Sequence, residues 1–561
     1  MKKSLQIDKK KNREENIMLE RYGEVVETVT MDYLKNYKGG TPDKSGANQI
    51  AFDLIDSMRM YVDTHNAAYP NNKWKAEEEL SCSQIGMILV HLHHVVNIDF
   101  AMSGRDAVTV VAMYQETGDD KGIYSTADKD INRLIRWYNF GATEKEIREI
   151  KAFIRDFAEV KTPNTNADLI PCANGIFNYK TKELKDYTPD IVFLAKSPVN
   201  FNPLAQNVVI HNDADGTDWD VESWMNNFYD DKDTVELLWQ IIGACLRPLV
   251  RWDKSAWFYS ESGNNGKGTL VELMRQLCGE HSCASISLAE MGQDFRLEPL
   301  MRASVILTDE NDVGTYIDKA ANLKAIITHD VLQVNRKFKE VIPLRPQVFM
   351  VQCLNEFPKI RDTSDSLYRR QIFVPFLKCF TGAERKYIKS DYLKRKEVLE
   401  YVMYRVLMKM DNYYELATTA LCDNALDEYK ECNDPVRQFV HDVLPRCKWD
   451  MLPFKFVYEL YVAWYKKSIG DHMYISNIKF NTKLIAIINA ENDWVCRDRN
   501  KTYSVHTSMA ATPEPLIAEY HLEEWMNPYY KSSQDVNKKC VFQGWVSRYK
   551  GIVRVGSAYD K

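Results

Sequence analysis

The sequence predicts a multidomain α/β protein whose central part binds phosphate groups. Its 561 residues are enough for several domains of roughly 100–200 residues each. Apolar residues make up 45% of the chain, which is ordinary for a folded globular protein, and no apolar run is long enough to span a bilayer. Near the middle, an apolar run leads into a Gly- and Asn-rich loop, a lysine and a helical pattern, which is the order of elements in a phosphate-binding loop.

The composition predicts a cytoplasmic protein without a structural metal. The twelve cysteines are scattered, none of them forms C-x-x-C, and no secretion signal opens the chain. The net charge of −6 argues against a surface coated with positive charge. Nucleic acid remains a possible partner, because a ring or groove can concentrate basic residues locally.

Breaks in the residue pattern divide the chain into six segments. Thr143 and Glu146 form a capping box that opens a helical repeat, Thr162–Asn166 interrupts the pattern, and Asn433–Pro435 marks a later boundary. We expect a flexible basic and polar segment (1–46), a helical N-terminal domain (47–160), a small α+β domain (161–232), a phosphate-binding core with lid helices (233–432), a winged-helix-like domain (433–510) and a C-terminal extension of unknown role (511–561).

Several shorter elements are defined well enough to be predicted by residue. A hairpin is expected from residues 176–179 and 184–187, and a helix from about 233 to 247, where Pro248 stops it. Within the winged-helix-like domain, amphipathic helices are expected at 454–465 and 478–488, followed by a hairpin at 494–505.

The loop that ends in Lys267 is the main candidate for binding a nucleoside triphosphate. Gly263 and Gly266 allow the backbone to approach a phosphate, and the helix that follows presents its positive N-terminal end to the anion. Lys267 can reach the outer phosphates. The residues expected to touch the nucleotide are Gly263, Asn264, Asn265, Gly266, Lys267, Gly268 and Thr269.

This loop departs from the general phosphate-loop pattern at two positions. Glu261 replaces the first glycine, and Gly268 replaces the hydroxyl residue that normally binds the metal. Thr269 is the nearby substitute, with Asp309 as the second expected metal ligand. Taken alone, the loop could also be a Gly-rich turn of no consequence.

Polar residues that follow two later strands complete the candidate catalytic site. Asp309 and Glu310 end a buried strand, where one carboxylate can hold Mg²⁺ and the other can orient water. Asn355 ends a second strand and can sense the γ-phosphate. The alternatives are an acidic turn for the pair and an ordinary turn residue for Asn355.

Two basic clusters point to partners beyond the nucleotide. The segment Lys324–Lys339 combines basic residues with an aromatic one, which fits a loop that binds a nucleic-acid backbone. A solvated charged hairpin is the alternative. Arg370, with Arg369 beside it, precedes a strand and could reach the ATP of a neighbouring subunit or make a salt bridge within its own. The candidate DNA-binding residues are Lys324, Arg336, Lys337, Phe338 and Lys339.

These motifs, in this order, resemble those of the superfamily 3 helicases, which are AAA+ ring motors of viruses and mobile elements. The likeness is greatest to the poxvirus-type and phage or plasmid primase-helicase family, and it covers about residues 100–510. Asn265–Thr269 fits the family's phosphate loop, and Asp309–Asn311 looks like its Walker B motif. Asn355 falls at sensor 1, Lys324–Lys339 at the motif that carries the pore hairpin, and Arg370 at the arginine finger.

The resemblance implies an ATP-dependent DNA helicase for replication of a phage, plasmid or mobile element in a bacterial cytosol. It implies ATP and Mg²⁺ as cofactors, a hexameric homo-oligomer with 3′→5′ polarity, and single-stranded and forked DNA as substrates. A replication initiator, primase or loader would be the protein partners. Primase chemistry is not expected, because the roughly 160 residues before the predicted hairpin are fewer than the roughly 200 that such a domain needs, and the stretch Asn97–Phe100 offers one lone acid, Asp99.

Three rival functions remain open. The first is a replication initiator that also nicks DNA: His91, His93 and His94 follow an apolar run and would bind its metal, and Tyr179 and Lys182 would form its nucleophile motif. Histidines that pack on a helix are the simpler interpretation. A P-loop phosphotransferase would not explain the basic hairpin. A DNA-binding scaffold with a dead nucleotide site would not need Lys267 or the acidic pair.

Overall fold

The computed structural model describes residues 21–560, except 105–106, 312–319, 361, 363, 383, 470–473, 491–492 and 534. Its contacts divide the chain into two compact units, which are described separately. The first contains Met1–Glu356 and Arg369–Leu421, and the second contains Phe357–Tyr368 and Cys422–Lys561. The division after residue 421 precedes the expected domain boundary at 433. In the described ranges, no helix is both long and apolar enough to cross a membrane.

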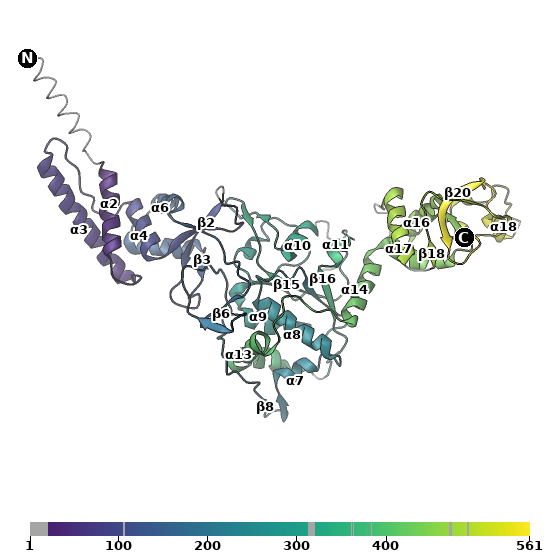
Figure 1. Cartoon of the computed structure of the whole chain (residues 1–561), viewed down its shortest axis with the longest axis horizontal. Helices are drawn as coiled ribbons and strands as arrows, with labels where there is room; N and C mark the ends of the chain where they lie inside the picture. The colour runs from purple at the N-terminus through teal and green to yellow at the C-terminus, as the bar shows by residue number, and fades with distance from the viewer. Residues whose placement is uncertain are drawn as a thin grey trace, which may run out of the picture. The chain divides into compact units, whose positions relative to one another are not determined.

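A five-stranded parallel sheet forms the core of the first unit (Figure 1). Across the sheet the strand order is β11-β12-β15-β10-β16, and all neighbours pair in parallel. The four longer strands are buried at every residue, as expected for a parallel sheet covered on both faces. The strands are β10 (Ser255–Tyr259), β11 (Cys283–Ala284), β12 (Val305–Thr308), β15 (Phe349–Leu354) and β16 (Gln371–Pro375).

Helices α8 (Lys232–Leu246) and α9 (Lys267–Cys278) pack against this sheet (Figure 1). The predicted helix at 233–247 is confirmed as α8, which Asp231 caps and which ends before Pro248. Further along the chain lie α10 (Ala320–Ile327) and the lid elements α12 (Lys386–Ser390) and α13 (Lys396–Tyr404).

An antiparallel hairpin lies between α10 and β15 in the sequence. It consists of β13 (Leu332–Val334) and β14 (Ile342–Leu344), with Gln333 opposite Pro343. This agrees with the hairpin expected in the basic segment.

The N-terminal domain contains a sheet as well as the predicted helices. The helices are α2 (Tyr22–Asn36), α3 (Lys44–Ala68), α4 (Cys82–Leu92), α5 (Asp128–Tyr138) and α6 (Glu144–Phe157), and the Thr143 capping box of α6 is confirmed. Four strands in the order β3-β2-β1-β4 correct the expectation of a helical domain. They are β1 (Val95–Asp99), β2 (Thr109–Tyr114), β3 (Tyr124–Ser125) and β4 (Val160–Lys161).

The physical reason for this correction is the β-branched content of the two longer strands. β1 and β2 are rich in valine and isoleucine, which favour a pleated surface, and β1 is buried throughout. Helix α2 also lies inside the segment expected to be flexible; residues 1–20 of that segment lie outside the described residues.

Two small sheets and a short helix connect the N-terminal domain to the core. The predicted hairpin at 176–187 is confirmed, since β6 (Gly175–Asn178) pairs with β7 (Glu183–Lys185). β5 (Leu169–Cys172) completes that sheet, and the second sheet pairs β8 (Ile210–Asn212) with β9 (Thr217–Trp219). Helix α7 (Val221–Asn226) follows directly.

The second unit surrounds a core rich in aromatic side chains. The two predicted amphipathic helices are confirmed as α16 (Phe454–Ser468) and α17 (Asn477–Ala490). The expected hairpin at 494–505 is wrong, because β18 (Trp494–Val495) and β19 (Thr502–Ser504) each pair with β20 (Arg548–Arg554) instead. The remaining elements are α11 (Asp365–Tyr368), α14 (Ala420–Asn433), α15 (Pro435–Asp442), β17 (Met451–Pro453), α18 (Thr507–Ala511) and α19 (Leu516–Glu519).

Strand β20 lies at the centre of that sheet and also pairs with β17. A side chain at Gly551 would place its Cβ 2.1 Å from the Leu452 carbonyl oxygen, so only glycine fits this approach of two strands.

Candidate functional site

The loop between β10 and α9 has the backbone geometry of an anion-binding turn. Gly266 adopts φ +84°, and a Cβ there would lie 2.5 Å from Cε1 of Phe228, so the position requires glycine. Asn265 Oδ1 accepts a hydrogen bond from the Lys267 amide at 3.2 Å. These contacts fix the turn that presents the N-terminal end of α9.

Lys267 lies at the carboxyl ends of two neighbouring strands. Its Nζ donates to the carbonyl oxygens of Ser260 and Leu354 and to Oδ1 of Asn355, each at 3.1 Å. The structure therefore brings Lys267 and Asn355 into contact, as the strand-end positions implied. The side chain is buried, and this burial lowers the pKa of Lys267.

The acidic pair lies at the same edge of the sheet. Asp309 and Glu310 directly follow β12 and are exposed, and Arg275 Nη2 donates to Asp309 Oδ2 at 3.3 Å. Burial first, and then the Asp309 charge, raise the pKa of Cys353 to about 12 against the opposing charges of Lys267 and Lys389. All three charges thus lie close enough to one buried thiol to act on it.

Asn311, which the sequence placed in the acidic motif, has a structural role. Its Nδ2 donates to Gln352 Oε1 and to the Cys353 carbonyl oxygen, both at 3.0 Å, and its Oδ1 accepts from the Leu288 amide at 2.8 Å. It therefore ties the end of β12 to β15.

The oxygen donors at this edge of the sheet suit Mg²⁺, and they are too few for a metal site made of protein ligands alone. Within the described ranges, no group of three or more His, Cys, Asp or Glu side chains could hold a metal. Mg²⁺ usually takes one or two carboxylates and completes its shell with water and phosphate oxygens. Asp309, Glu310 and the Thr269 hydroxyl supply donors of that kind.

A cavity of about 700 Å³ adjoins the loop and is large enough for a nucleotide. Three segments distant in sequence form it: residues around β9 and α7, the start of α9, and the lid around α12. Its aromatic lining residues are Trp219, Trp224, Phe228 and Phe380, and its charged ones are Glu272, Glu384, Arg385, Lys386, Lys389 and Lys394. The sequence analysis did not identify these residues, because no single stretch contains them.

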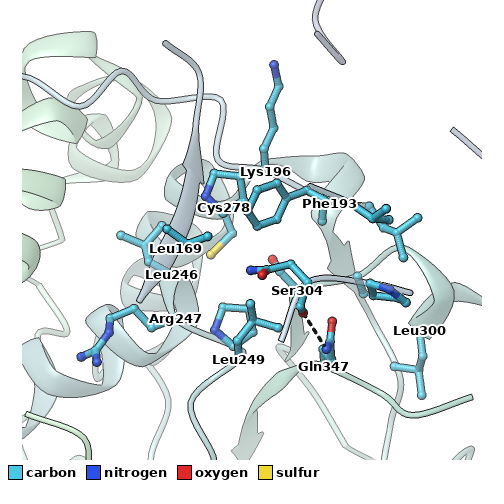
Figure 2. A pocket seen from close by; sticks show the side chains of 18 of the residues that line it. Leu169, Phe193, Lys196, Leu246, Arg247, Leu249, Cys278, Leu300, Ser304 and Gln347 are labelled. Carbon is cyan, nitrogen blue, oxygen red and sulfur yellow. Dashed lines mark hydrogen bonds between the residues drawn. The ribbon is translucent and has the colours of Figure 1, made fainter. Parts of the chain in front are cut away.

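A second cavity, of about 80 Å³, lies among residues that precede the core strands (Figure 2). Ser304 precedes β12 and Gln347 precedes β15, so this cavity is at the amino edge of the sheet, away from Lys267. In Figure 2, the Arg247 guanidinium points away from it and Lys196 extends outward. It is too small for a nucleotide, so the larger cavity is the candidate site.

The tip of the β13–β14 hairpin carries four of the five predicted DNA-binding residues. Phe338 is 94% exposed, with the Lys337 Nζ 5.4 Å from its ring centroid. Arg336 Nε donates to the Glu340 carbonyl oxygen at 3.1 Å. The fifth residue, Lys324, lies on α10 and outside the hairpin.

Lys339 contacts the N-terminal domain. Its Nζ lies 2.6 Å from Oδ2 of Asp128 on α5, and Lys151 contacts the same carboxylate at 2.8 Å. Burial alone raises the pKa of Asp128, but the hydrogen bonds from the two lysines outweigh it and lower that pKa to about 2.

Arg370 lies at the opposite edge of the core sheet from Lys267. It precedes β16, and its carbonyl oxygen accepts a hydrogen bond from the Ser255 amide at 2.8 Å, at the start of β10. The whole length of β10 separates this edge from the phosphate loop. Arg369 beside it is exposed.

The histidines of the rival nicking function lie at the end of a helix and just after it, and none of the three lies on a strand. His91 belongs to α4, and His93 caps it, buried with its Nε2 2.8 Å from the Tyr138 hydroxyl. Burial first, and then the nearby His94, lower the pKa of His93 to about 4. Tyr179, the nucleophile of that alternative, is fully buried beneath Arg247 and Lys182.

Comparison with protein families gives three matches along the chain. Residues 18–229 match a family described as D5 N terminal like, residues 258–370 match a family of unknown function (DUF5906), and residues 431–515 match a family described as poxvirus D5 protein-like. The first and third matches support the resemblance to poxvirus-type D5 proteins, while membership of superfamily 3 stays a prediction. No curated protein matches the chain.

Solved structures give weaker likenesses. Three apo structures of the NrS-1 C-terminal region have TM-scores of 0.40, 0.43 and 0.42 at 14, 12 and 12% sequence identity. They cover 73, 85 and 77% of this chain and 86, 100 and 98% of those chains. Scores this low do not assign a fold.

Proposed function

We propose that this protein is an ATP-driven DNA helicase that acts in the replication of a phage, plasmid or other mobile element. One observation carries the proposal: Lys267, Asn355 and Asp309 lie at one edge of a parallel sheet, beside a cavity of about 700 Å³. The D5-like family matches support a replication-associated role.

The strand order supports an AAA+ core. β15 lies between the phosphate-loop strand β10 and the acidic strand β12, so Asn355 at the end of β15 falls between Lys267 and Asp309. An inserted strand with a polar residue at its tip is the arrangement that the family resemblance implies for sensor 1. In open parallel sheets, ligands bind at the carboxyl ends of the strands, where these three residues lie.

The residues have separate roles in the proposed reaction. ATP phosphates replace the three oxygen acceptors of Lys267 and contact the amides at the start of α9. Asp309 and Thr269 would hold Mg²⁺, which would neutralise phosphate charge when bound. Glu310 orients and deprotonates the attacking water, and Asn355 contacts the γ-phosphate.

Arg370 acts, in this proposal, on the ATP of the next subunit. Its position at the amino edge of the sheet keeps it from its own phosphate loop, so its contribution requires an oligomer, which we propose is a hexameric ring. The hairpin tip of Arg336, Lys337, Phe338 and Lys339 then lines the pore and moves single-stranded DNA, with 3′→5′ polarity. Forked DNA is the substrate, and an initiator, primase or loader protein would deliver it.

The second unit contributes a winged helix in this proposal. Its element order, α15-β17-α16-α17-β18-β19, supports this assignment, while β18 and β19 pair with β20 rather than with each other. Such a domain would bind duplex DNA or a partner protein.

DNA-stimulated ATP hydrolysis tests the proposed function. We expect the wild-type protein to hydrolyse ATP, to do so faster with single-stranded DNA, and to unwind a forked duplex. Lys267→Ala should lower hydrolysis by on the order of 100-fold or more, because it removes the cation that contacts the phosphates. Lys396→Ala is the matched control, since Lys396 pairs with Glu400 outside the cavity.

Two results would contradict the proposal. If Lys267→Ala hydrolysed ATP at the wild-type rate, this loop would not be the nucleotide-binding site. Wild-type hydrolysis that is indifferent to DNA, with transfer of phosphate to a small acceptor, would instead favour a P-loop phosphotransferase.

A further inference from the structure

Gly268 leaves open the place where most phosphate loops carry a hydroxyl, and a lysine from the lid lies there. A Cβ built on Gly268 would be 3.6 Å from the Nζ of Lys389, which belongs to helix α12. Because the side chain that follows the loop lysine normally points at the nucleotide's metal and phosphates, the Lys389 ammonium occupies that region.

Lys389 lines the large cavity together with three other basic residues, Arg385, Lys386 and Lys394. Among these, Lys389 is the one whose Nζ is located against the start of α9. Burial and the Asp309 charge raise the pKa of Cys353, and the charges of Lys267 and Lys389 both oppose this, so both ammonium groups act on the same thiol of β15.

The two carboxylates that line the cavity have other partners and do not pair with Lys389. Glu384 is engaged with the Asn264 amide group at 3.0 Å, and Glu272 accepts from Gln276 at 2.8 Å and faces Arg275. Lys389 itself is exposed and makes no hydrogen bond or ion pair with any residue that the structure describes. Two lysines and the positive end of α9 therefore converge on one space, which favours a polyanion there.

Contacts on both sides hold the lid helix in this place. The Phe380 amide donates to the Asn264 carbonyl oxygen at 2.8 Å, which joins the lid to the phosphate loop. On the other side, the Tyr387 hydroxyl donates to Asp215 Oδ2 at 2.6 Å in the turn between β8 and β9. Lys389 is thus presented to the cavity by a segment anchored at two points.

We propose that Lys389 is a second phosphate-contacting lysine, which reaches the β- and γ-phosphates of the bound nucleotide through the space left by Gly268. This inference rests on the proposed nucleotide site and adds a residue to it. It explains why the loop departs from the general pattern at Gly268: a larger side chain there would compete with the lid lysine.

Nucleotide binding by Lys389→Ala tests the inference, with ATP, ADP and AMP as probes for calorimetry. We expect affinity for ATP and ADP to fall roughly 10- to 100-fold, the range for loss of a charged hydrogen bond, while AMP affinity stays near the wild-type value. Lys389→Arg should retain most of the affinity, because it keeps the charge. Lys396→Ala removes a charge outside the cavity and should bind all three nucleotides normally.

The ratio of ADP to AMP affinity separates phosphate contact from a structural effect. If Lys389→Ala keeps the wild-type ratio, or loses all three nucleotides equally, the inference is overturned. Failure of the underlying site looks different, since the wild-type protein would then bind none of the three and Lys267→Ala would change nothing.

Discussion

Lys267 has surroundings that suit an incoming anion. In the free protein its ammonium is held by three neutral oxygen atoms, and burial lowers its pKa. A phosphate would supply the opposite charge that these oxygens lack, and would favour the protonated form. The ammonium is therefore stabilised more strongly by a triphosphate than by the three neutral oxygens, as a nucleotide-binding lysine requires.

His93 predicts how the N-terminal domain responds to acid. Its pKa in the folded chain is about 4, against an ordinary 6.5, because burial disfavours the charged imidazole. Between these values the unfolded chain binds a proton that the folded chain does not, so stability falls as pH drops from 6.5 towards 4. The loss approaches about 3 kcal/mol.

His93→Gln should flatten this dependence, because glutamine can still bond the Tyr138 hydroxyl but does not titrate. The measurement is hydrogen exchange of α4 and α5 between pH 7 and pH 4.5, corrected for the intrinsic rate. His91 on the same helix also has a pKa lowered by burial, so His91→Gln serves as the comparison. Equal pH slopes for wild type and His93→Gln would show that another group is responsible.

At single positions, sequence was informative where the signal is local. Lys267, Asp309 and Asn355 each end or follow an apolar strand, and parallel strands bring such ends together. Lys389 and Trp219 carry no such signal, because their relation to the loop exists only after distant segments have folded against one another.

Among the secondary-structure elements, the β13–β14 hairpin contacts the N-terminal domain through an ion pair. Lys339 at its tip pairs with Asp128 on α5, and the low pKa of Asp128 keeps that carboxylate charged above about pH 4. A lysine proposed to bind DNA is therefore already occupied by a carboxylate in the free protein. DNA has to displace Asp128 to engage Lys339.

Asp128→Asn should accordingly tighten binding of single-stranded DNA. We expect a gain of about 2- to 5-fold at low salt, since an exposed pair contributes under roughly 1 kcal/mol. Fluorescence anisotropy with a labelled oligonucleotide measures it. Asp156→Asn changes the charge equally but has no contact with Lys339, so it controls for net charge; an equal gain in both variants would exclude specific competition.

Element boundaries were predictable where caps or prolines fix them, as at Thr143 and Pro248. The sheets of the N-terminal domain and of the second unit could not be predicted from the sequence. β1 and β2 are short and flanked by helices, and β20 pairs with strands far earlier in the chain. Pairing over such distances depends on tertiary contacts that leave no periodic signal in either partner.

For the whole molecule, the central question is whether one chain forms a complete catalytic site. Lys267 is at the carboxyl edge of the core sheet and Arg370 at the amino edge, so a single chain does not bring them together. An arginine can complete the site only if a second copy places its amino edge against the first copy's cavity. From the sequence, an arginine finger was the prediction for Arg370 and a salt bridge within one subunit was the alternative.

Mixing two inactive variants distinguishes these arrangements. Lys267→Ala keeps Arg370, and Arg370→Ala keeps Lys267, so each alone should lose hydrolysis, the second by on the order of 10³-fold if it is an arginine finger. In mixed oligomers, some seams combine Lys267 of one subunit with Arg370 of its neighbour. An equal mixture should therefore regain roughly a quarter of the wild-type ATPase activity, if the variants assemble at random. An ATPase assay on co-assembled protein measures this, and activity no higher than that of the separate variants would place Arg370 outside the neighbour's site.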